Sequence, residues 1–155
     1  MFKRLRLLRA SRRNAIALSK AVDASIARLF QRPIGKHLRD RGITPDDTRD
    51  HVRSYAEHIL GVDWYRSIVA HRACRKPLEE AVAFWDQCIG EVKANFMAPD
   101  TGISSALGSC LALHSAAAAL LAVDEKLGAH ALKDGAEMIE WLERSIQEGA
   151  FDTTN

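Results

Sequence analysis

The chain has 155 residues, of which 47% are hydrophobic and 27% are charged. This length fits one domain that can bury its own core without disulfide bonds. The cysteines are odd in number and none follows a C-x-x-C spacing, which speaks against a disulfide framework or a zinc ribbon and favours a reducing, cytoplasmic compartment.

The formal net charge of +2 hides a strong asymmetry along the chain. Residues 1–41 contain twelve Lys or Arg and two Asp, a balance of +10, whereas residues 42–155 contain ten basic and eighteen acidic side chains, a balance of −8. The basic end should attract phosphate groups, anionic lipids or an acidic protein surface.

The apolar positions of residues 3–31 recur mostly at three- and four-residue steps, which predicts a long helix. They are Leu5, Leu8, Ala15, Leu18, Val22, Ile26, Leu29 and Phe30. Four cations, Arg6, Arg9, Arg13 and Lys20, fall within a sector of about 60° beside this apolar arc. The pattern is that of a basic amphipathic helix. No uninterrupted apolar stretch follows the first nine residues, so a signal peptide is not expected, and Lys20 and Asp23 interrupt the hydrophobic region that a twin-arginine signal would need after Arg12 and Arg13.

Helix boundaries are expected at several turn signals further along the chain. A short helix over 34–41 should end at Gly42, and Thr44-Pro45-Asp46-Asp47 should begin the next one, with Thr44 as its cap. Gly61 is expected to end that helix in a left-handed conformation and Asp63 to cap its successor. Pro77 either starts a new helix or kinks a continuing one.

The second half of the chain is more apolar. An inward-facing stripe is expected at Leu78, Val82, Trp85, Ile89, Val92 and Phe96, followed by a loop over 97–102. Residues 103–123 carry no formal charge and are interpreted as a buried central helix rather than a membrane span, with small residues at 104, 108, 112 and 116 that allow close packing. A last helix after Gly128 should place Leu132, Gly135, Met138, Trp141, Leu142 and Ser145 inward.

These elements predict an all-α fold, a single domain over 1–155 that forms an antiparallel bundle of five to six helices. Residues 1–31 form its basic N-terminal helix and residues 44–148 its core. No alternation typical of β-strands is present.

Two pairs of metal-ligating residues share helical faces. His71 and Cys74 are three residues apart, and Cys110 and His114 are four apart, so the four side chains could surround Zn²⁺ if the two faces met. Buried cysteine and histidine residues more often serve in cores. We therefore expect no metal and no cofactor.

The segment Ala129–Ala136, with His130 and Lys133, resembles the phosphoacceptor helix of histidine phosphotransfer domains. The resemblance implies that His130 accepts a phosphoryl group and that Lys133 supports it electrostatically. Asp134 departs from the family's pattern, because it stands where a glycine is expected, and about 20 residues follow where the family has two further helices. The alternative is a surface histidine and lysine on an acidic helix.

The sequence contains no phosphate-binding glycine loop and no nucleophile elbow, so we expect a non-enzymatic interaction protein. Its basic first helix is expected to bind a second copy or a protein partner. The alternatives are nucleic acid, contacted through Arg6, Arg9, Arg13 and Lys20, and a membrane surface. Deletion of residues 1–31 is expected to abolish assembly and to leave a folded core.

Overall fold

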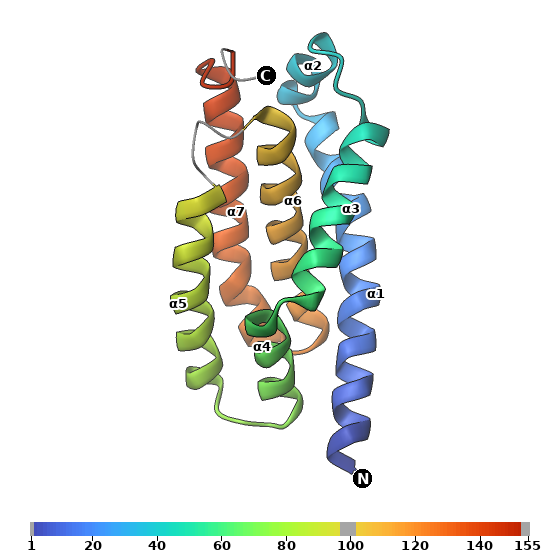
Figure 1. Cartoon of the computed structure of the whole chain (residues 1–155), viewed down its shortest axis with the longest axis vertical. Coiled ribbons are helices and arrows are strands. Elements are labelled where there is room, and N and C mark those ends of the chain that lie inside the picture. The colour runs from blue at the N-terminus through green and yellow to red at the C-terminus, as the bar shows by residue number, and fades with distance from the viewer. Residues whose placement is uncertain (1, 97–101, 153–155) are drawn as a thin grey trace.

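In the computed structural model, α-helices lie side by side in a bundle (Figure 1). The structure describes residues 2–96 and 102–152, which contain seven α-helices, one short 3-10 helix and no strand. The elements are α1 (Phe2–Gln31), α2 (Pro33–Asp40), α3 (Pro45–Gly61), α4 (Asp63–Ala73), α5 (Leu78–Phe96), α6 (Ile103–Ala119), η1 (Leu120–Ala122) and α7 (Glu125–Gln147). The all-α prediction is confirmed. The count of five to six helices was too low, because a turn before Pro77 separates α4 from α5.

A local sequence signal explains the start of α3. The Thr44 hydroxyl accepts a hydrogen bond from the backbone N–H of Asp47 at 3.2 Å, with Pro45 in the first turn, which confirms the predicted cap. The predictions for Gly61 and Asp63 were wrong. One extended residue, Val62 (φ −74°, ψ 133°), joins α3 to α4, so the chain turns without a left-handed glycine and Asp63 is already helical.

Helix α6 is the central element, and it packs against α1, α3 and α7 (Figure 1). The segment Ile103–Ala122 has a mean hydropathy of 1.6, long and apolar enough to cross a membrane by length and composition, but 72% of it is buried inside the bundle. Gly108 allows α3 to approach closely, since a Cβ there would lie 2.6 Å from Cδ2 of Tyr55. The predicted buried helix with small contact residues is confirmed at this position.

The hydrophobic core extends beyond the predicted range of 44–148. Its α1 members are Ala10, Leu18, Val22, Ile26, Leu29 and Phe30, and Phe151 closes it at the other end. Deleting residues 1–31 would therefore remove these six core residues, which argues against the prediction that a folded core remains. The inward stripes of α5 and α7 are confirmed, with Trp85 and Met138 fully buried. The side chain of Phe96 and residues 97–101 of the predicted loop lie outside the described residues.

Candidate functional site

The first turns of α1 project past the end of the bundle (Figure 1). Residues 2–9 are all exposed apart from the partly buried Leu7, and the first buried residue is Ala10. Large hydrophobic side chains are exposed here: Phe2 by 73%, Leu8 by 60%, Ile16 by 50% and Leu5 by 43%. A single exposed leucine is ordinary, whereas a group of such side chains on one helix is typical of interaction surfaces.

The four predicted cations, Arg6, Arg9, Arg13 and Lys20, are exposed on the same helix. None of them forms a salt bridge with any residue that the structure describes. Leu5, Arg9, Arg12 and Ile16 follow at steps of four, three and four residues, so two basic side chains lie between two apolar ones along one face. We call Phe2, Leu5, Leu8 and Ile16, together with Arg6, Arg9, Arg12, Arg13 and Lys20, the α1 surface.

A buried polar contact sets the orientation of this helix. The side-chain amide of Asn14 donates a hydrogen bond to the Tyr65 hydroxyl at 2.9 Å, and that hydroxyl donates to the carbonyl oxygen of Ala116 at 3.0 Å. Burial raises the pKa of Tyr65, so the hydroxyl remains a donor. The two bonds join α1, α4 and α6. Sequence reasoning missed Asn14, although it lies four residues before Leu18 in the apolar stripe.

A surface of the opposite charge lies on α5. Glu80, Phe84, Gln87 and Glu91 follow at steps of four, three and four residues, and all are exposed. Phe84 is 38% exposed. We call Glu80, Phe84 and Glu91 the α5 surface. Helices α1 and α5 lie on opposite sides of the bundle (Figure 1).

The predicted metal candidates are not brought together. Among the described residues, no three of the four side chains His71, Cys74, Cys110 and His114 place ligand atoms within 4.8 Å of one another. Burial raises the pKa of Cys110 to about 12, so its thiol stays protonated. Nε2 of His71 lies 3.4 Å from a carboxylate oxygen of Glu80.

Three other side chains do approach one another between α5 and α7. The ligand atoms of Asp86, His130 and Asp134 lie within 4.8 Å of each other. Nε2 of His130 is 2.7 Å from Oδ1 of Asp86. Asp134 accepts hydrogen bonds from Nε1 of Trp85 at 2.8 Å and from Nζ of Lys93 at 3.1 Å. The Lys93 ammonium therefore already neutralises the charge of Asp134, which weakens the attraction of this cluster for a metal cation.

These contacts bear on the phosphoacceptor prediction. His130 is half-buried, and the nitrogen that faces Asp86 would bring a phosphoryl group towards two carboxylates, at a cost from like-charge repulsion. Lys133 is exposed, as its predicted supporting role requires. Phosphoryl transfer to His130 stays a prediction.

The described residues thus present one basic, partly apolar surface on α1 and one acidic surface with an exposed phenylalanine on α5. Their separation across the bundle allows each to contact a different molecule. Comparison of the chain with known proteins finds no matching family model, no significantly similar curated protein and no significantly similar solved structure.

Proposed function

We propose that the protein is a non-enzymatic, antiparallel helical bundle that assembles with copies of itself, the α1 surface of one molecule docking on the α5 surface of the next. The observation that carries this proposal is the exposure of Phe2, Leu5, Leu8 and Ile16 among arginines that form no salt bridge with any described residue. Apolar side chains buried at such a contact would contribute affinity, and the charges would select the orientation.

Charge favours the α5 surface over a second α1 surface as the partner. Pairing two α1 helices would bring arginine against arginine, which is repulsive. Glu80 and Glu91 are complementary to Arg6 and Arg9, and Phe84 offers an apolar contact between the acids. Because the two surfaces lie on opposite sides of the molecule, the interface is heterologous and leads to rings or chains rather than to a twofold dimer.

Sedimentation velocity of the full chain tests this arrangement by charge reversal. The double variants R6E/R9E and E80K/E91K should each be monomeric, because like charges then face each other across the interface. An equimolar mixture of the two should form a complex, since the reversed surfaces are again complementary. Assembly of the wild-type chain should weaken between about 50 mM and about 500 mM salt, because surface charges are screened.

The double variant K36E/K133E is the matched control for R6E/R9E, since it changes the net charge by the same amount at exposed lysines of α2 and α7. It should assemble like the wild type. Leu5→Ser with Leu8→Ser should also reduce assembly, whereas Leu121→Ser, an exposed leucine outside α1, should not. A wild-type chain that remains monomeric at every concentration and salt tested would overturn self-assembly.

Nucleic-acid binding is the second candidate, favoured by the four exposed cations of α1 that have no salt bridge within the described residues. If these cations contact about four phosphates, the logarithm of the binding constant should fall with the logarithm of the salt concentration with a slope near −3.6. Fluorescence anisotropy with a labelled DNA duplex of random sequence should show this slope, and Arg9→Gln should reduce it by about one, whereas Lys36→Gln should not. Absence of binding at about 50 mM salt would remove this candidate.

A further inference from the structure

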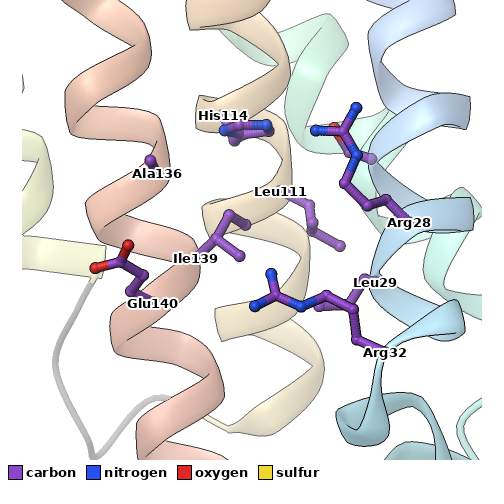
Figure 2. Close-up of a pocket in the computed structure, with 9 residues that line it drawn as sticks. Arg28, Leu29, Arg32, Leu111, His114, Ala136, Ile139 and Glu140 are labelled. Atoms are coloured by element: carbon purple, nitrogen blue, oxygen red, sulfur yellow. The ribbon is translucent and has the colours of Figure 1, made fainter.

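A pocket of about 180 Å³ lies between α1, α6 and α7 (Figure 2). The guanidinium group of Arg28 extends into it from α1, and that of Arg32 extends from the junction between α1 and α2. The imidazole of His114 lies opposite on α6. Leu111, Ala136 and Ile139 supply apolar walls. The pocket is distinct from both the α1 surface and the α5 surface, and the proposed assembly does not use it.

The charges around the pocket leave one guanidinium group free. Arg32 forms a salt bridge with Glu143 at 2.8 Å, whereas Arg28 has none among the described residues. Glu140 is exposed at the rim, and its carboxylate is directed away from both guanidinium groups in Figure 2. One unpaired positive charge beside an apolar wall suits a single negative charge.

His114 adds a polar atom without a partner. Its Nδ1 is buried and forms no hydrogen bond with any described residue. A Cβ at Gly135 would lie 2.8 Å from Nδ1, so the absence of a side chain at position 135 makes room for the ring. Burial, and next the positive charge of Arg28, lower the pKa of His114, while the backbone of Gly135 offsets part of this effect. The arginines also disfavour a metal cation at His114.

We propose that this pocket binds a small organic monocarboxylate. The carboxylate would contact the Arg28 guanidinium and the His114 ring, and the apolar part would lie against Leu111 and Ile139. Arginine binds carboxylates through paired, charge-assisted hydrogen bonds. A cavity of about 150 Å³ accommodates a benzene ring, so the ligand is of the size of benzoate.

NMR titration of the isotope-labelled full chain with benzoate tests the proposal. Benzoate should shift the amide resonances of Leu111 and Ile139 and the imidazole resonances of His114, whereas benzyl alcohol, which has the same ring and no charge, should not. Arg28→Gln should weaken benzoate binding at least about tenfold, as expected for the loss of a charge-assisted bond. Arg53→Gln, an exposed arginine on α3, is the matched control and should change nothing.

Ala136→Leu tests the same site without a change in charge, because the larger side chain would fill the pocket and abolish binding.

Benzoate affinity should also rise several-fold from pH 7.5 to pH 5.5, since an anion favours a protonated His114, and this dependence should vanish in His114→Gln. The charged groups that line or adjoin the pocket are Arg28 on α1, Arg32 between α1 and α2, and Glu140 and Glu143 on α7. Undiminished binding in both Arg28→Gln and Ala136→Leu, no shift at the pocket residues, or inorganic phosphate binding as tightly as benzoate would overturn the proposal.

Discussion

Arg75 is the only non-glycine residue with a left-handed backbone (φ 59°) in the part of the chain that the structure describes. It ends α4 in a Schellman motif, in which Lys76 N–H donates to the His71 carbonyl and Arg75 N–H to the Arg72 carbonyl. The same motif ends α2 and α7, but there the left-handed position is held by Gly42 and Gly149.

Arg75→Gly should stabilise the protein by about 1 kcal/mol, because glycine adopts this conformation without the steric cost that other residues bear. Gly42→Ala is the matched reverse substitution, since a Cβ there would meet nothing within 4 Å and only the backbone conformation is penalised. It should destabilise by about the same amount. Urea denaturation of both variants measures these changes, and an Arg75→Gly variant that is less stable than the wild type would contradict the argument.

His114 should make stability depend on pH. Its pKa is lower in the folded chain than in the unfolded chain, because of burial and of Arg28, so the unfolded state binds more protons as the pH falls through the usual imidazole range near 6.5. The free energy of unfolding should therefore fall from pH 7.5 to pH 5.5. The fall should be smaller in His114→Gln than in the wild type, and the exposed His58→Gln controls for the loss of one imidazole. An equal fall in the His114→Gln variant would exclude this contribution.

At the scale of helices, close packing of α6 depends on small residues. Gly108 lies beneath the Tyr55 ring of α3, and a methyl group there would come within 2.6 Å of the ring carbon Cδ2. Gly108→Ala should destabilise the protein by about 1–3 kcal/mol through overpacking. Gly90→Ala on α5, where a Cβ would meet nothing within 4 Å, should instead stabilise by about 0.5–1 kcal/mol through helix propensity. Thermal unfolding of the two variants should give melting temperatures that shift in opposite directions.

Helices were predictable from the sequence where a local pattern determines them. The Thr44 cap depends on four adjacent residues, and the stripes of α5 and α7 depend on the helical period, so both could be read without a structure. The conformation around Gly61 could not, because a glycine at a helix end permits a left-handed cap without requiring one. Leu5 and Leu8 could not be distinguished from Leu18, which belongs to the same predicted stripe, because their exposure depends on how far the other helices extend along α1.

The candidate sites divide in the same way. The cations of α1 are evident from composition alone, whereas the pocket joins Arg28, His114 and Ile139 from three helices that are distant in the chain. Periodicity places each of these residues on a helix, but it does not determine how the three helices are oriented relative to one another. Arg28 also lacks a salt bridge among the described residues because Glu143 pairs with Arg32 rather than with Arg28, which the sequence does not reveal.

For the whole molecule, we expect the first turns of α1 to serve interaction and the remainder of the helix to stabilise the fold. Deletion of residues 2–9 should change the free energy of unfolding by no more than about 0.5 kcal/mol, because none of these side chains is fully buried. Deletion of residues 2–31 should prevent folding, since Leu18, Val22 and Ile26 belong to the core. Circular dichroism and urea denaturation distinguish the two cases. Substantial destabilisation by the shorter deletion would show that the projecting turns support the fold.

The hydrogen bonds from Asn14 to Tyr65 and from Tyr65 to Ala116 fix the rotation of α1 about its own axis relative to α4 and α6. Because these bonds favour one rotation of α1 against the bundle, Phe2, Leu5 and Leu8 are left exposed to water in an isolated molecule. The arginines between these apolar side chains then oppose precipitation by charge repulsion, as gatekeeper residues do beside aggregation-prone segments. Neutralising the arginines of α1 should therefore lower the solubility of the unassembled chain before it alters the fold.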